Sequence, residues 1–96
     1  MINYYEVAKA AKILRAVNHK LRQNIIALIQ KQDKGRITVT EIYVLLRLEQ
    51  SVASQHLAIL RKAGVVTTQR EGKFIYYSVN EAKLKNIEAQ ALELTK

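Results

Sequence analysis

The sequence predicts a single, mainly α-helical domain with a small β-hairpin, on three observations. The chain has 96 residues, no proline and three glycines, which favours one compact unit without an internal linker. Apolar residues recur at helical spacing through most of its length. Residues 65–79 change to two runs rich in β-branched and aromatic residues around a tight turn. We expect one domain over residues 1–96, with the order α-α-α-α-β-β-α.

The first expected helix covers about residues 4–17. Asn3 is a candidate N-cap, and Tyr5, Ala8 and Ile13 fall on one face. This helix is rich in alanine and has little bulk with which to hold itself on a core. We therefore expect it to pack against a second subunit; the alternative is a simple flanking helix.

The second expected helix begins after Asn18, a candidate cap, and ends at residues 32–35. His19 lies in its first turn, where a surface imidazole is expected rather than a metal ligand. The spacing of the apolar residues indicates a central core helix; these residues are Leu21, Ile25, Leu28 and Ile29.

Residues 37–39 begin as a strand-like segment, and the chain then becomes helical up to residue 46. Thr40 is the candidate cap of this third helix, with Glu41 in the favoured first turn. We expect a buried side formed by Ile42, Leu45 and Leu46. A short break at residues 47–49 separates this helix from the next one.

The fourth expected helix covers residues 49–64 and is stopped by Gly64. At about 100° per residue, its apolar side holds Ala53, Leu57 and Leu60, with Val52, Ile59 and Ala63 beside them. The opposite side is polar and not bulky enough to keep the helix out of a DNA major groove; it consists of Gln50, Ser51, Ser54, Gln55, Arg61 and Lys62. His56 falls on the apolar side, so we expect it to be packed and hydrogen-bonded within the fold.

Two strands are expected after Gly64, over residues 65–70 and 74–79, joined by Glu71-Gly72-Lys73. Basic residues flank the tip of this hairpin. Tyr76 and Tyr77 point to opposite faces of their strand, so one can join the core. Two short helices joined by a turn and followed by such a hairpin are typical of a winged helix-turn-helix.

Asn80 is the candidate cap of a last helix over about residues 81–94. Its apolar stripe needs a partner surface, and we expect it to pair with the N-terminal helix across a two-fold axis. The stripe consists of Leu84, Ile87, Ala91 and Leu94.

Charge and composition limit the classes of function that the protein can have. Sixteen basic and eight acidic residues give a formal charge of +8. This excess of positive charge indicates a polyanionic binding partner, and nucleic acid is favoured over an anionic membrane. The lack of cysteine excludes disulfides, thiolate metal sites and thiol redox sensing by this chain alone. No apolar run is long enough to span a membrane and no signal peptide is apparent, so we expect a cytoplasmic protein. Two separated histidines and no phosphate-cradling glycine loop argue against an enzyme.

Three stretches together resemble the ArsR/SmtB family of small bacterial winged-helix repressors. Residues 54–66 are similar to its recognition helix and exit, residues 70–77 to its wing, and residues 18–22 to the start of its second helix. Each motif alone is weakly specific, but all three occur in order at compatible spacing, and the resemblance covers about residues 11–80. It implies a homodimer built on the first and last helices that binds an inverted-repeat operator.

The chain departs from the metal-sensing members of that family. Thr38-Val39-Thr40 stands where many members have a Cys-x-Cys pair, and hydroxyls are poor ligands for soft metals. The last helix lacks the histidines with which other members bind zinc. We therefore expect no metal and no cofactor. Gln55 stands where the family often has arginine, and Arg47 where it often has a small residue.

The candidate DNA contacts form two sets, with a solvated side chain as the alternative for each. Side chains that both donate and accept hydrogen bonds are assigned to base edges: Gln50, Ser51, Ser54 and Gln55. Flexible cations are assigned to phosphates or, on the wing, to the minor groove: Arg47, Arg61, Lys62, Arg70 and Lys73.

Together these observations predict a homodimeric, sequence-specific transcriptional regulator that binds double-stranded DNA and acts as a repressor. A small-molecule effector that these residues do not identify is compatible with this function. The alternative is a winged-helix module that binds another protein without recognising a specific operator.

Overall fold

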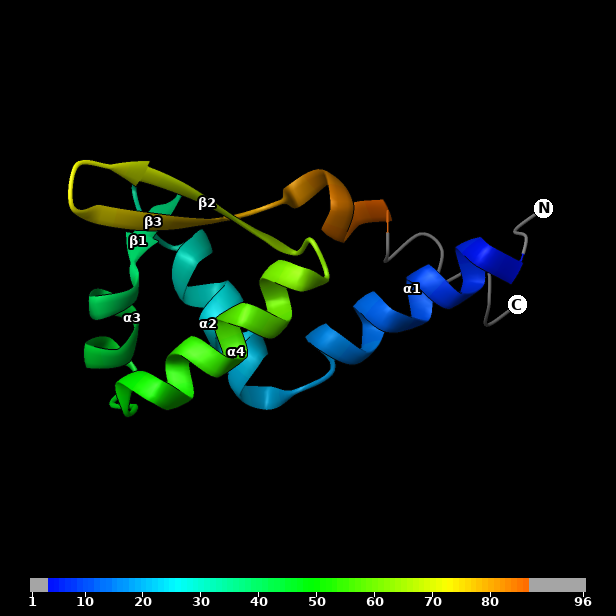
Figure 1. The fold of residues 1–96 in the computed structure, drawn as a ribbon, viewed down its shortest axis with the longest axis horizontal. Coiled ribbons are helices and arrows are strands. Elements are labelled where there is room, and N and C mark those ends of the chain that lie inside the picture. The colour runs from blue at the N-terminus through cyan, green and yellow to red at the C-terminus, as the bar shows by residue number, and fades with distance from the viewer. Residues whose placement is uncertain (1–3, 87–96) are drawn as a thin grey trace.

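The computed structural model describes residues 4–86, and side chains from residue 8 onward, as helices packed against a small antiparallel sheet (Figure 1). The elements are α1 Tyr4–Val17, α2 Lys20–Gln30, β1 Arg36–Thr38, α3 Val39–Leu45, α4 Gln50–Lys62, β2 Val66–Glu71 and β3 Phe74–Val79. Residues 81–86 begin a further helix. The mainly helical fold with a hairpin is as predicted, while Asn3 as a cap and residues 87–94 lie outside the described residues.

The sheet has one strand more than expected. Its order is β1-β3-β2, with both neighbours antiparallel to β3, and Ile37 of β1 lies opposite Tyr77. Residues 36–38 thus use the free edge of β3. A two-stranded hairpin is marginal alone, so this extra strand helps to fix the hairpin to the helical body.

The hairpin turn is as tight as the sequence predicted. Glu71 pairs with Phe74, which leaves Gly72 and Lys73 as a two-residue connection. Gly72 has a φ of 61°, the positive value that the favoured hairpin turns require. In Figure 1 the hairpin tip and the N-terminal end of α1 lie at opposite ends of the molecule.

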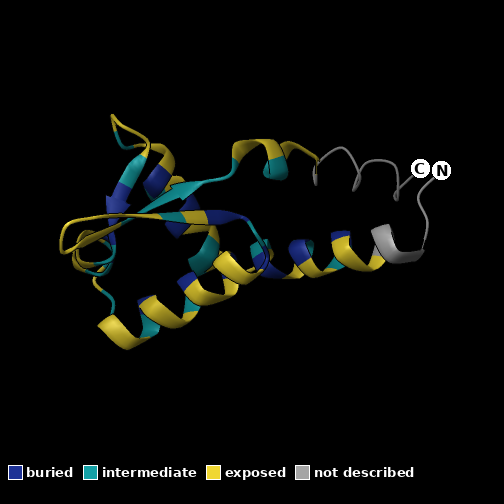
Figure 2. Ribbon diagram, turned by 45° about the horizontal axis from the view of Figure 1, so that its top comes forward, coloured by how far each residue is buried: buried dark blue, intermediate teal, exposed yellow. Residues whose placement is uncertain are grey.

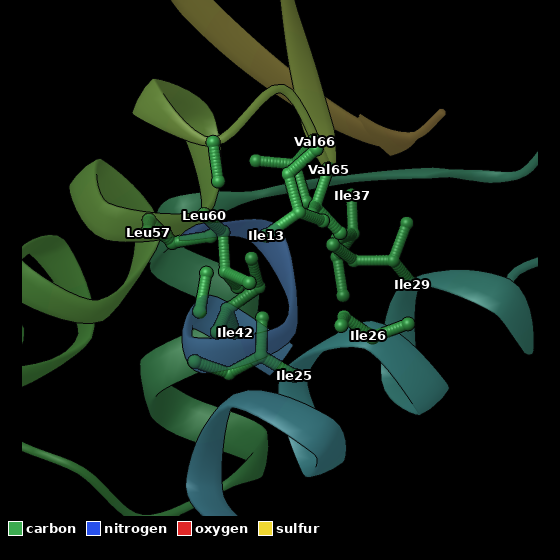
Figure 3. Packing of buried hydrophobic residues seen from close by; sticks show 12 residues of the cluster. Ile13, Ile25, Ile26, Ile29, Ile37, Ile42, Leu57, Leu60, Val65 and Val66 are labelled. Carbon is green, nitrogen blue, oxygen red and sulfur yellow. The ribbon is translucent and has the colours of Figure 1, made fainter. Parts of the chain in front are cut away.

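The core is aliphatic and draws on nearly every element (Figure 3). The largest fully buried side chains are all branched, and they are Ile25, Ile29, Ile37, Ile42, Leu57, Leu60, Val65 and Val66. Ile13 and Ala16 of α1 belong to the same cluster. The expectation that α1 has too little bulk to hold itself on a core is therefore wrong for its C-terminal half. Its buried stripe is Ala10, Ile13 and Ala16, whereas Ala8 is exposed.

Two helix caps differ from the predicted residues. Asn18 donates its backbone N–H to the Leu14 carbonyl at 2.8 Å, so it still belongs to the last turn of α1. His19 caps α2 instead, because its Nδ1 accepts from the N–H of Leu21 at 3.1 Å. Thr38, not Thr40, caps α3, with Oγ1 accepting from the N–H of Glu41 at 3.3 Å.

The buried side of α3 also differs from the prediction. Ile42 is fully buried as expected, but Leu45 is 58% exposed. The side of α3 that packs against the core consists of Val39, Ile42 and Leu46, and Leu45 lies about 100° away from Leu46 around the axis. Asn80 caps the helix that follows β3 as predicted, its Oδ1 accepting from the N–H of Lys83 at 3.1 Å.

Candidate nucleic-acid interface

Helix α4 presents the two faces that its sequence predicted. Ala53, Leu57 and Leu60 are buried, and the opposite side is open to solvent along its whole length (Figure 2). The exposed side holds every predicted polar residue of this helix: Gln50, Ser51, Ser54, Gln55, Arg61 and Lys62. Ile59, placed beside the apolar face in the prediction, is 39% exposed at the margin of this surface.

The turn that presents α4 has a strained residue. Arg47 has a φ of 56°, the left-handed region that favours glycine. The turn is closed by the N–H of Leu48, which donates to the Tyr43 carbonyl at 2.9 Å. Arg47 is exposed and lies three residues before the first residue of α4.

The hairpin has an inner and an outer face, because side chains alternate along each strand. Tyr77 and Val79 pack against the core and define the inner face. By register, Arg70 lies opposite Ile75 and Thr68 opposite Tyr77, so all four residues share that face. Of the two predicted wing cations, Arg70 therefore lies on the inner side, and its Nε donates to the Gly72 carbonyl at 3.2 Å. Lys73 stands at the tip, with Nζ 5.4 Å from the Phe74 ring centroid.

The outer face is tied to β1 by an ion pair. Arg36 Nη1 lies 2.8 Å from Glu71 Oε1, and the Arg36 guanidinium stands 4.2 Å from the Tyr76 ring centroid. The hydrogen bond from Arg36 lowers the pKa of the Glu71 carboxyl. Tyr76 and Tyr77 thus point to opposite faces, with Tyr77 in contact with the core, as predicted.

A groove of about 400 Å³ runs between α4 and the inner face of the hairpin. Its lining combines polar and basic side chains of α4 with a tyrosine from β3: Ser54, Leu57, Ala58, Arg61, Lys62 and Tyr77. Leu57 was assigned to the core, and two further lining residues, Ala58 and Tyr77, were missed as candidate contacts. Ala58 is at the middle of the exposed arc and could have been found from the helical count. Tyr77 could not, because its position over α4 depends on how the hairpin crosses that helix.

His56 is packed and hydrogen-bonded, as predicted. It is half-buried, and its Nδ1 accepts from Arg22 Nε at 3.2 Å. Its ring centroid lies 4.9 Å from that of His19. Burial, followed by the charges of His19 and Arg22, lowers the pKa of His56.

Within residues 4–86 no three His, Cys, Asp or Glu side chains gather closely enough to hold a metal ion. The same part of the chain contains no helix long and apolar enough to cross a membrane. The arrangement that remains is α3, a turn and α4, followed by a wing, with cations beside a surface of short polar side chains. This arrangement defines a winged helix-turn-helix of the DNA-binding class.

Known proteins place the chain within that class. The family described as "Bacterial regulatory protein, arsR family" matches residues 19–68. The transcriptional repressor PagR of Bacillus anthracis is 35% identical over 86 residues, which cover 90% of this chain and 84% of PagR. The transcriptional activator HlyU of Vibrio cholerae is 33% identical over 78 residues, 81% of this chain and 69% of HlyU.

Solved structures agree with the fold. The crystal structure of PagR from Bacillus anthracis superimposes with a TM-score of 0.76 at 32% identity, covering 92% of this chain and 99% of PagR. NolR from Sinorhizobium fredii superimposes with a TM-score of 0.75 at 30% identity, covering 95% and 88%. The chain belongs to the arsR family of bacterial regulatory proteins, and the resemblance seen in its motifs is confirmed. It is a DNA-binding transcriptional regulator and not an enzyme.

Proposed function

We propose that the protein acts as a homodimeric repressor that inserts α4 into the major groove of a specific operator. The single observation that carries this proposal is the exposed face of α4, on which short hydrogen-bonding side chains are flanked by cations. The width of a major groove admits such a helix. A repressor is proposed because PagR is named a repressor, although the relative HlyU is named an activator.

The proposed DNA contacts form two groups, one to base edges and one to phosphates. Gln50, Ser51, Ser54 and Gln55 are proposed to read base edges, since each can donate and accept hydrogen bonds and all lie on one exposed arc. Phosphates are the proposed partners of the cations around that arc: Arg47, Arg61, Lys62, Arg70 and Lys73. Arg70 lies on the inner face of the hairpin. Its proposed partner is therefore a phosphate of the DNA strand that passes between α4 and the hairpin.

The dimer is proposed to form through α1 and the helix that begins at residue 81, within a single domain. Two copies of α4 would then read half-sites about 34 Å apart, or one turn of DNA. A small-molecule effector could act by changing that separation. We place the protein in the cytoplasm because its proposed target is the chromosome.

A protein-binding module is the second candidate, favoured by one observation. Val44 and Leu45 of α3 are adjacent large apolar residues that are 60% and 58% exposed. If this surface were the main binding site, selection from random DNA duplexes would return no preferred sequence. Recovery of an inverted repeat would instead support operator recognition.

The base and phosphate assignments are tested by two substitutions on the selected operator. We expect Gln55→Ala to change the preferred base at one position, because a bidentate pair with adenine discriminates by about 1–3 kcal/mol. Lys73→Ala should weaken binding to all sequences similarly. Competition binding against operators with single base changes measures both effects.

Lys31→Ala is the matched control for the loss of one charge. Lys31 follows Gln30, whose Nε2 donates to Glu81 at 3.1 Å, so it lies at the end of α2 that faces the last helix rather than the polar face of α4. We expect it to reduce affinity less than Lys73→Ala. Equal shifts in base preference from Gln55→Ala and Lys73→Ala would contradict the assignment.

A further inference from the structure

Arg22 of α2 contacts both neighbouring helices. Its Nη1 donates to the carbonyls of Arg15 and Ala16 at 3.2 and 3.1 Å, and its Nε donates to His56 Nδ1 at 3.2 Å. The two carbonyls belong to the last turn of α1, whose oxygens have no partner within the helix. One guanidinium thus connects the end of α1 with the middle of α4.

The geometry of these three hydrogen bonds suits an arginine. Its planar guanidinium presents several N–H groups in fixed directions, so separate nitrogens can serve α1 and α4 at the same time. A lysine ammonium could reach one of these acceptors but could not hold both helices in a fixed relation. Gln23 supports the same junction, its Nε2 donating to the Val17 carbonyl at 3.0 Å.

The contact with α4 requires a neutral imidazole, because Nδ1 of His56 accepts the hydrogen bond. A proton on Nδ1 would remove the acceptor and place a cation against Arg22. His19 is the other titratable group in contact with His56. The hollow between α1 and α4 next to Arg22 is lined by Lys12, Arg15 and Lys62 and, among the described residues, by no carboxylate that could compensate the added charge.

We propose that Arg22 and His56 form a proton-sensitive latch that fixes the recognition helix α4 relative to α1. This inference depends on the proposed function, in which α4 reads DNA and α1 contributes to the dimer. Arg22 and His56 are positioning residues, because neither side chain belongs to the exposed face of α4. The closed latch sets the separation of the two α4 helices, and acid opens it.

The first test compares wild type, His56→Asn and His19→Asn. Asparagine can place its Oδ1 near the position of His56 Nδ1, so it keeps an acceptor and cannot titrate. We expect the operator affinity of wild type to fall about tenfold between pH 7.5 and 5.5, as for the loss of a hydrogen bond to a charged group. His56→Asn should bind equally well at both pH values. His19→Asn keeps a good helix cap and removes a charge that lowers the pKa of His56, so the fall in operator affinity should remain and should begin at a higher pH than in wild type.

Non-specific DNA serves as an internal reference, because added positive charge at low pH strengthens binding to any duplex. Its affinity should therefore rise or stay constant on acidification while the operator affinity falls. Arg22→Lys keeps the charge but cannot bridge, so it should lose about tenfold in operator affinity at pH 7.5. Arg22→Lys should also bind operators with altered half-site spacing better, relative to the normal operator, than wild type does. Loss of a residue that only stabilises the fold would not change this preference for one spacing.

The latch can also be tested by measuring the pH dependence of thermal stability without DNA. This test does not depend on the proposed function. The depressed pKa of His56 means that its stabilising contribution is complete above its ordinary value of about 6.5 and is lost as pH falls below it. Thermal unfolding of wild type should shift to lower temperature over that range, and unfolding of His56→Asn should shift less. If wild type binds no specific DNA but shows this difference, the proposed function fails and the latch stands. Wild-type pH dependence in His56→Asn would overturn the latch, even if Arg22→Lys fails to fold.

Discussion

Arg47 adopts a left-handed backbone conformation, with a φ of 56°, at the turn between α3 and α4. A side chain in this region costs about 1–2 kcal/mol, part of which glycine would recover. We expect Arg47→Gly to leave the free energy of unfolding unchanged or raise it by up to about 1 kcal/mol, measured in urea. The same change should weaken DNA binding severalfold, because it removes a proposed phosphate contact.

Arg47→Ala separates these two effects. It removes the same charge but keeps a Cβ in the left-handed region, so it should be less stable than Arg47→Gly and bind DNA equally weakly. If the two variants have equal stability, the backbone at residue 47 is not strained. Affinities equal to wild type would show that Arg47 does not contact DNA.

The roles of single residues could be predicted where they depend on neighbours in the sequence. They could not be predicted where they depend on contacts between distant parts of the chain. The polar face of α4 and the packing of His56 followed from the helical period alone. The cap of α2 did not, because Asn18 and His19 both offer an acceptor, and the choice depends on how far α1 continues. The partner of His56, Arg22, is 34 residues away in the sequence, and nothing in the local pattern indicated it.

At the scale of elements, helix α4 and the hairpin form one surface through Tyr77. The ring packs against the core while the residue lines the groove beside Ser54 and Arg61. We propose that the Tyr77 hydroxyl donates a hydrogen bond to DNA at this groove. Tyr77→Phe should then keep thermal stability near that of wild type and reduce operator affinity about fivefold, as for the loss of one neutral hydrogen bond. Fluorescence anisotropy with labelled operator measures this loss.

Tyr76→Phe is the matched control, because Tyr76 lies on the outer face of the same strand against Arg36. It should leave DNA affinity unchanged. Equal losses from both substitutions would mean that the inner face of the hairpin is not the side that meets DNA.

The bounds of several elements followed directly from the sequence. α1 and β3 have the predicted limits, because helical periodicity and a run of β-branched and aromatic residues are strong local signals. β1 was predicted only as a strand-like piece, since its pairing with β3 joins residues about 40 positions apart. The exposure of Leu45 was missed for a related reason: Leu45 and Leu46 both lie about one turn after Ile42, and the docking of the whole helix decides which of the two meets the core.

At the scale of the whole molecule, the charge of +8 makes a quantitative prediction about DNA binding. Each phosphate neutralised by a basic side chain contributes about −0.9 to the slope of log affinity against log salt concentration. Five proposed phosphate contacts in each subunit, Arg47, Arg61, Lys62, Arg70 and Lys73, give a slope of about −9 for a dimer on a full operator.

A single half-site should show a slope of only about −4.5, because it can engage the cations of one subunit. Titrations of both duplexes between about 50 and 200 mM salt measure the two slopes over a range in which such complexes lose several orders of magnitude in affinity. Equal slopes would indicate that one subunit binds at a time, against the proposed dimer. A flat dependence on the full operator would contradict the phosphate contacts themselves, because a surface with this excess of positive charge cannot bind a polyanion without releasing its counterions.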